Sequence, residues 1–176
     1  MLLVLILPCT KKPIGVRTPQ ASVWSICKKV HEPSICFKTI LPTALTTPKF
    51  NIYKALDVEI QAASVQINKT ISIITSLMHK YPDKPGLSPA LRGCKDLYEM
   101  MPDSINNAIA SLAEHAAKEA QFQFGSIASY HLSCTIGFEE METVVPFPAD
   151  AKLVWDLAAN CGDIANAIWN RVKRTP

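Results

Sequence analysis

Apolar residues recur at every third or fourth position through most of this chain, which is the spacing of amphipathic α-helices. Four long segments show it: 51–80, 88–112, 117–142 and 150–172. Within 117–142 the apolar positions form a strict heptad seam, made of Phe124, Ile127, His131, Cys134, Phe138 and Met141. Because the connections are short, neighbouring helices should run antiparallel, and the pattern predicts an all-α, up-down-up-down four-helix bundle over 51–172.

Polar residues and prolines set the expected ends of these helices. The stretch "YPDKPGLSP" closes the first helix, and Ser88 is the expected N-cap of the second. Pro102 falls inside the second helix, so we expect a kink or brief interruption there, with Asp103 and Ser104 available to cap the continuation. Asp150 is the expected N-cap of the fourth helix.

Ahead of the bundle, the stretch "ICKKVHEPSICFKTI" predicts two short helices, over 22–31 and 34–41. Pro33 separates them, since proline is tolerated at the start of a helix but not in its interior. The following "LPTALTTPKF", residues 41–50, contains two prolines and is predicted to be a linker. The expected domain therefore covers 22–176, with a helical hairpin at 22–41 in front of the bundle.

The first 21 residues differ in character from the rest. They open with a short apolar run that has the length of a signal-peptide core and is too short to span a bilayer. No positive charge precedes the run, so an unstructured N-terminus is the alternative interpretation. We expect a signal or unstructured segment over 1–21, and cleavage of a signal peptide would remove Cys9.

Composition and charge narrow the range of partners. An apolar content of 48% in 176 residues is enough for one domain with a real core. The formal charge of +3 comes from Lys11, Lys12 and Arg17, and the remaining chain is neutral, without the basic stripe of a nucleic-acid-binding protein. We therefore expect no nucleic-acid partner, and no membrane partner because no apolar run reaches membrane length.

The cysteines predict the redox state of the protein. None has CxxC spacing or a histidine in a ligand pattern, so a metal site is not expected. Cys27 and Cys36 lie symmetrically about the break before Pro33. Cys94 and Cys134 lie symmetrically about residue 114, each ~30 Å along its helix from that connection. These symmetries predict disulfides 27–36 and 94–134 in a secreted protein. The alternative is a cytosolic protein with reduced core thiols.

Few other residues suggest chemistry. Cys161 lies on the apolar face of the fourth helix and is expected to be a buried free thiol. Asn68 opens the only N-glycosylation sequon, which matters if the chain is secreted. The chain has no GxSxG, GxGxxG, HExxH or phosphate-loop motif, and His131 is expected to be a half-buried core histidine rather than a general base. We expect no catalytic residue, no cofactor, no metal and no small-molecule substrate.

The expected cysteine framework, a bridged hairpin followed by a bundle bridged between its second and third helices, resembles the plant invertase and pectin methylesterase inhibitor family, including its pollen-allergen branch. The matching stretches are "CKKVHEPSICFKTI", "LRGCKDLYEMM", "SCTIGFEE" and "AANCGDIANAIWNRV", within residues 24–172. The resemblance implies a secreted, apoplastic, non-enzymatic protein that binds and inhibits a carbohydrate-processing enzyme of the plant cell wall.

The resemblance leaves two targets. Invertase inhibitors of the family carry a Pro-Lys-Phe tripeptide between the second and third bundle helices, where this chain has 117–119, "AKE", and only Lys118 matches. The "PKF" at 48–50 precedes the bundle and is interpreted as a coincidence. Pectin methylesterase is therefore the favoured target and acid invertase the alternative, with a non-inhibitory helical binding module as a third hypothesis. Lys118 is the candidate target contact.

Overall fold

The all-α prediction is confirmed by a computed structural model of the chain, which describes residues 18–173. This part of the chain contains seven helices and no strand: α1 (Pro19–Cys27), α2 (Pro33–Thr46), α3 (Ile52–Lys80), α4 (Leu87–Glu99), α5 (Met101–Ala113), α6 (Ala117–Glu140) and α7 (Pro148–Val172).

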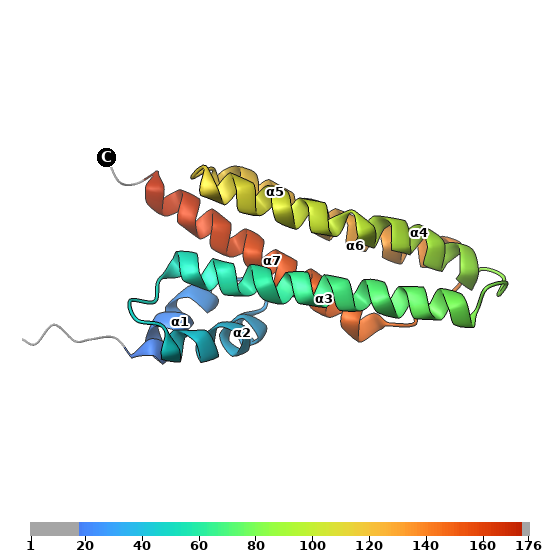
Figure 1. Cartoon of the computed structure of the whole chain (residues 1–176), viewed down its shortest axis with the longest axis horizontal. Coiled ribbons are helices and arrows are strands. Elements are labelled where there is room, and N and C mark those ends of the chain that lie inside the picture. The colour runs from blue at the N-terminus through green and yellow to red at the C-terminus, as the bar shows by residue number, and fades with distance from the viewer. Residues whose placement is uncertain (1–17, 174–176) are drawn as a thin grey trace, which may run out of the picture.

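The four long rods lie side by side along the long axis of the molecule (Figure 1). α3 and α6 run in one direction, and α4–α5 and α7 return in the other, so the predicted up-down-up-down bundle is confirmed. α1 and α2 form a hairpin that packs on one side of the bundle, against α3 and α7. The hairpin therefore packs mainly on the first and last bundle helices, and His31 at its tip lines a pocket with residues of α6 and α7.

One continuous core fills the bundle and extends under the hairpin. Its largest fully buried side chains include Tyr98, Phe124, Phe138, Leu56 and Leu91. On α6 the predicted seam is buried at Phe124, Ile127, Cys134 and Phe138 and half-buried at His131. Met141 is 45% exposed because α6 ends one residue before it.

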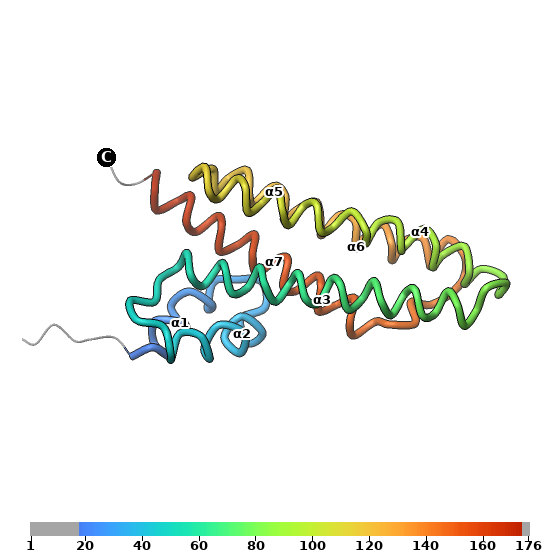
Figure 2. Tube along the Cα trace, in the orientation of Figure 1, coloured from blue at the N-terminus to red at the C-terminus, as the bar shows by residue number. Residues whose placement is uncertain are grey.

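The second bundle helix is interrupted, as expected from Pro102. α4 and α5 are separated only at Met100, and the trace in Figure 2 shows them as one nearly straight rod. Pro102 lies in the first turn of α5, where no intrahelical N–H donor is needed. The expected recapping by Asp103 or Ser104 is wrong, since no side chain caps this helix start.

The expected N-cap role of Ser88 is also wrong. α4 begins at Leu87, with Gly86 as its N-cap residue at φ +72°. A Cβ at Gly86 would lie 2.8 Å from the backbone oxygen of Met141, so only glycine fits both the space and the dihedral angle. The Ser88 hydroxyl instead donates to the carbonyl of Pro82 at 2.7 Å and stabilises the preceding turn.

Asp150 is not the N-cap of α7, which begins at Pro148. It lies in the first turn, where its carboxylate accepts from Gln66 Nε2 at 3.0 Å and pairs with Lys69 Nζ at 2.8 Å. The hydrogen bonds from Lys69 and then Gln66 lower the pKa of Asp150. This residue therefore joins α7 to α3 rather than closing its own helix end.

The predicted linker at 41–50 is wrong over its first half, because α2 continues through Pro42 to Thr46. Ile40 and Ala44 on either side of Pro42 are buried, so tertiary packing holds the helix through the lost hydrogen bond. At the other end of the hairpin, α1 begins at Pro19 rather than at residue 22. Residues 1–17 of the expected signal segment, Cys9 included, lie outside the described residues.

Candidate functional site

Two disulfide bonds brace the fold. Cys27–Cys36 joins α1 to α2 across the hairpin, and Cys94–Cys134 joins α4 to α6 inside the bundle. All four cysteines are buried, and the pairing is the one that the cysteine spacing predicts. The second bond fixes α6 against α4, so the position of α6 in the bundle is held by a covalent bond.

Cys161 is a buried free thiol in α7, close to the buried carboxylate of Glu59 in α3. Burial and, to a smaller extent, that carboxylate raise the pKa of Cys161 well above its ordinary value. The thiolate is the nucleophilic form of cysteine, so a buried side chain that stays protonated is unreactive, and Cys161 belongs to the core.

A buried polar network links the hairpin to the bundle. Asn160 of α7 binds the backbone of Glu32 in the hairpin turn twice, accepting from its N–H at 2.8 Å and donating to its carbonyl at 3.2 Å. The same amide donates to Glu59 Oε1 at 2.9 Å. Burial raises the pKa of Glu59 to about 7, despite the opposing hydrogen bond from Asn160. The network connects three elements through one asparagine side chain.

The histidine of the seam has no general-base arrangement. His131 Nδ1 lies 3.3 Å from the hydroxyl of Tyr98, and its ring is tilted against Trp155. Burial lowers the pKa of His131 and raises the pKa of Tyr98. Both groups are therefore neutral partners in a core hydrogen bond at physiological pH.

The connection between α5 and α6 is a tight three-residue turn. His115 takes the left-handed conformation at φ +60°, and the N–H of Ala116 donates to the carbonyl of Ser111 at 2.8 Å. This is the Schellman arrangement, which is usually built with glycine at the left-handed position. The turn places Lys118 in the first turn of α6, exposed to solvent.

The outward side of α6 carries a second heptad stripe, opposite the buried seam. We call it the α6 outer face, and it consists of Lys118, Phe122, Gly125, Ser129, Leu132 and Ile136. Its apolar members are unusually exposed for their type: Phe122 is 74% exposed, Leu132 54% and Ile136 42%. A shallow groove runs along it, lined by Lys118, Gln121, Phe122, Gly125, Ser126 and Ser129. The groove forms because Gly125 and the two serines are small beside Phe122.

Charged residues lie at both ends of α6. Lys118 and Glu119 lie in its first turn, and Glu139 and Glu140 lie in its last turn. A face with an apolar middle and charged ends is the arrangement of a protein-binding surface, with an apolar centre and a polar rim.

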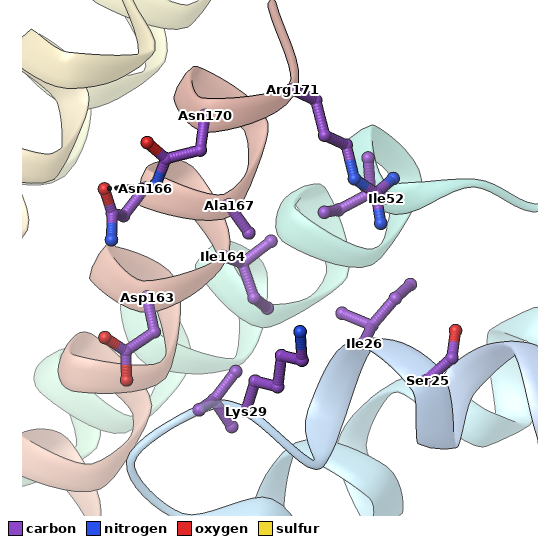
Figure 3. Close-up of a pocket in the computed structure, with 11 residues that line it drawn as sticks. Ser25, Ile26, Lys29, Ile52, Asp163, Ile164, Asn166, Ala167, Asn170 and Arg171 are labelled. Carbon is purple, nitrogen blue, oxygen red and sulfur yellow. Dashed lines mark hydrogen bonds between the residues drawn. The ribbon is translucent and has the colours of Figure 1, made fainter. Parts of the chain in front are cut away.

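A pocket of about 320 Å³ lies where the hairpin meets α3 and the end of α7. In Figure 3, Lys29 of the hairpin and Arg171 of α7 extend over a floor that includes Ile26, Ile52 and Ile164. Both cations are exposed, and the wall on α7 adds the acid Asp163 and two asparagines. The pocket thus mixes charges of both signs, and no nucleophile and base converge in it.

The remaining sequence candidates lie apart from the α6 outer face. Asn68 is exposed on α3, and Thr70 of its sequon is buried, donating to the carbonyl of Gln66 at 2.8 Å. Residues 48–50 form the connection between α2 and α3, with Lys49 at φ +53° and Phe50 packed against the core. Neither of these segments belongs to the turn that carries Lys118.

Residues 18–173 contain neither a cluster of metal-binding side chains nor a membrane-spanning helix. In that range, no three histidine, cysteine, aspartate or glutamate side chains are grouped so that they could hold a metal ion. The same range contains no helix with both the length and the apolarity needed to cross a bilayer.

Sequence reasoning found Lys118 but missed the rest of the α6 outer face. The available signal was that Phe122, Leu132 and Ile136 are apolar yet fall off the heptad seam. A helix with apolar residues on two opposite sides is either buried all round or presents one side to a partner. The fold decides between these, because α6 has neighbours on its seam side only.

Proteins of similar sequence and structure include three from Arabidopsis. The putative pectinesterase/pectinesterase inhibitor 26 of Arabidopsis thaliana is 28% identical over 99 residues, which cover 55% of this chain and 10% of that protein. This chain therefore spans about a tenth of the length of that curated relative.

Two solved structures share the fold. A crystal structure of mutant form A of a pectin methylesterase inhibitor from Arabidopsis matches with a TM-score of 0.67 and 18% identity, covering 81% of this chain and 93% of that one. A crystal structure of a pectin methylesterase inhibitor from Arabidopsis thaliana matches with a TM-score of 0.62 and 20% identity, covering 83% and 95%.

The family model described as plant invertase/pectin methylesterase inhibitor matches residues 21–164, which include the hairpin, both disulfides and most of the bundle. Members of this family are inhibitors and not enzymes, in agreement with the sequence-based expectation. The chain therefore belongs to the plant invertase/pectin methylesterase inhibitor family.

Proposed function

We propose that this chain is a secreted protein inhibitor of a pectin methylesterase and that it binds its target through the α6 outer face. Family membership limits the target to a pectin methylesterase-type enzyme or an invertase. The names of the relatives favour the esterase. The proposed surface rests on one observation. Phe122, Leu132 and Ile136 are exposed on α6, and a disulfide bond fixes this helix to α4.

The chemistry of the α6 outer face suits a protein partner. Complete burial of an exposed side chain of this kind contributes ~1.5–3 kcal/mol, and Phe122, Leu132 and Ile136 would each contribute the part that corresponds to their exposed fraction. Gly125 and Ser129 leave room for side chains of the partner beside Phe122. A specific interface buries on the order of 800 Å² on each partner, so this single helix face would need its neighbours to complete the contact. Lys118 would lie at the rim and pair with an acid of the target.

Secretion to the apoplast is part of this proposal. Two disulfides are typical of a protein that matures in an oxidising compartment. The apolar run within residues 1–21 would serve as the signal sequence, and the inhibitor domain would begin near residue 22. Asn68, exposed on α3, would carry an N-linked glycan away from the α6 outer face.

Acid invertase is the alternative target. The observation that favours it is Lys118, which occupies the first turn of α6 directly after the α5–α6 connection. If acid invertase is the target, Lys118 would contact it without the proline and phenylalanine of the Pro-Lys-Phe tripeptide, because alanine and glutamate flank Lys118 in this chain. A helical binding module that inhibits neither enzyme is the third hypothesis.

A paired inhibition assay separates the three. The purified protein is titrated against a plant pectin methylesterase and a plant acid invertase, and residual activity is followed to a stoichiometric end point. Loss of esterase activity alone is expected. Loss of invertase activity alone would replace the proposal with its alternative. Full activity of both enzymes at micromolar excess of the protein would leave only the non-inhibitory module.

A further inference from the structure

His31 lies in the turn between α1 and α2, where the tip of the hairpin meets α7. Its Nε2 atom has two neighbours on that helix. The indole Nε1–H of Trp155 donates to it at 3.0 Å, and Oδ1 of Asp156 lies 3.4 Å away. The two rings meet edge to face. One nitrogen of the hairpin therefore faces a donor and an acceptor on consecutive residues of α7.

A single imidazole nitrogen cannot serve both neighbours at once. When His31 is neutral with its proton on Nδ1, Nε2 is an acceptor and suits the indole of Trp155. When His31 is protonated, Nε2 carries a proton and can only donate, so it suits the carboxylate of Asp156. Histidine is the side chain whose charge ordinarily changes between pH 5 and 8.

The carboxylate of Asp156 lacks the donor that a protonated His31 would supply. Its side chain is only 2% exposed, and its Oδ1 atom has no hydrogen-bond partner within the described residues. Its other oxygen accepts from Lys152 Nζ at 2.6 Å. A buried carboxylate oxygen without a donor is destabilising, so a new donor at 3.4 Å would be favoured.

We propose that protonation of His31 exchanges its partner on α7, from the indole of Trp155 to the carboxylate of Asp156, so that the hairpin tip is held more strongly at acid pH. Trp155 is half-buried, and its released N–H can bind water. The exchange needs only a small movement of the His31 ring, which is itself 42% exposed. It concerns the attachment of the hairpin and does not depend on the proposed target enzyme.

The charged groups around His31 come from four elements. On α7, Asp156 and Asp163 favour the imidazolium and Lys152 opposes it. In the hairpin turn, Glu32 favours it. From α6, His131 approaches Trp155, and because burial lowers its pKa it becomes positively charged only at a lower pH than an ordinary histidine. From α3, Glu59 reaches the turn through Asn160. The acids outnumber the bases, so the surroundings permit the exchange.

Double-mutant cycles at two pH values test the exchange. His31→Ala is combined with Asp156→Asn and, separately, with Trp155→Phe, and unfolding by urea is measured at about pH 5 and about pH 8. The His31–Asp156 coupling should change the folded-to-unfolded ratio roughly 3- to 10-fold at the lower pH and vanish at the higher. The His31–Trp155 coupling should show the opposite pattern. The titration of Glu59 and the loss of the Lys152 pair cancel within each cycle.

Asp163→Asn provides the matched control, since Asp163 lines a pocket with His31 but no bond joins it to His31 Nε2. Its coupling to His31 should be small at both pH values. Equal couplings of Asp156 at the two pH values, or a larger one at the higher pH, would overturn the proposal.

Nuclear magnetic resonance of the unmutated protein gives a second readout that no folding defect can disturb. The indole N–H resonance of Trp155, assigned with Trp155→Phe, should shift on acidification in step with the ring protons of His31. Its exchange with solvent should accelerate at the same time, while the indoles of Trp24 and Trp169 serve as internal references. An indole signal of Trp155 that stays constant while His31 titrates would also overturn the proposal.

Discussion

The buried carboxylate of Glu59 makes the stability of this protein depend on pH in a way that one substitution can isolate. Glu59 is completely buried in α3, with one oxygen bound by Asn160 and the other without a partner among the described residues. Burial raises the pKa of Glu59 from its ordinary 4.5 to about 7. The folded protein therefore holds this proton at pH values where the unfolded chain has released it.

The sign and size of the effect follow from this difference. Between pH 4.5 and about 7 the unfolded chain binds fewer protons at Glu59 than the folded protein does, so stability falls as the pH rises. One pH unit of pKa difference corresponds to ~1.4 kcal/mol, which gives roughly 3 kcal/mol for Glu59. The full contribution is present below pH 4.5 and is lost above pH 7.

Glu59→Gln removes the titration and keeps an oxygen to accept from Asn160. Urea denaturation of both proteins across this pH range gives the free energy of unfolding, and the difference between variant and parent cancels every other titrating group. The variant should gain roughly 3 kcal/mol on the parent between pH 4.5 and pH 8. Glu119→Gln, the same change on an exposed side chain, is the matched control. A difference that does not vary with pH would refute the assignment of Glu59.

Three further predictions concern stability and processing. Replacing Cys94 and Cys134 together by serine should lower the free energy of unfolding by ~4 kcal/mol, because the bond closes a loop of 40 residues; equal urea midpoints for variant and parent would contradict this. His115→Gly should raise the free energy of unfolding by roughly 0.5–1 kcal/mol, since glycine takes the left-handed conformation without strain. A lower thermal midpoint of the variant would contradict this and would show that the His115 side chain stabilises the turn. Protein secreted from a plant or yeast host should lose mass on treatment with a peptide N-glycosidase, and Asn68→Gln should abolish that loss; an unchanged mass would mean that the sequon is unoccupied.

The architecture could be predicted because two independent patterns agree on it. The apolar spacing defines the four long helices, and the symmetric cysteine pairs require antiparallel neighbours at matched heights. The spacing of apolar residues shows where the helices lie and which side of each carries most of its apolar residues, and both can be read from the sequence. The same information places Lys118 after the α5–α6 turn.

The helix ends were less predictable because they depend on contacts with residues outside the helix concerned. Ser88 and Asp150 are good capping residues by type, yet each is bound by groups in another segment, at Pro82 and at Gln66 and Lys69. Pro42 has the local signature of a helix end, yet packing of its neighbours carries α2 onward. Local propensity is a weak prior that tertiary contacts override.

The candidate surface was the least predictable part. An exposed phenylalanine and a buried one look alike in sequence until the fold shows which side of the helix is covered. Once α6 is known to pack only through its seam, Phe122, Leu132 and Ile136 become surface residues that folding leaves unburied. The buried network of Glu59, Asn160 and the hairpin turn also joins residues about 100 positions apart, a relation that no local pattern reports.

The most direct test of the proposed function compares two exposed aromatic residues. Phe122→Ala removes the most exposed apolar side chain of the α6 outer face, whereas Tyr53→Ala removes an exposed aromatic side chain on α3. Both are surface changes, so circular dichroism should show an unchanged fold. The inhibition constant against pectin methylesterase should rise at least about tenfold for Phe122→Ala and stay unchanged for Tyr53→Ala. Equal inhibition by both variants and the parent protein would contradict the account.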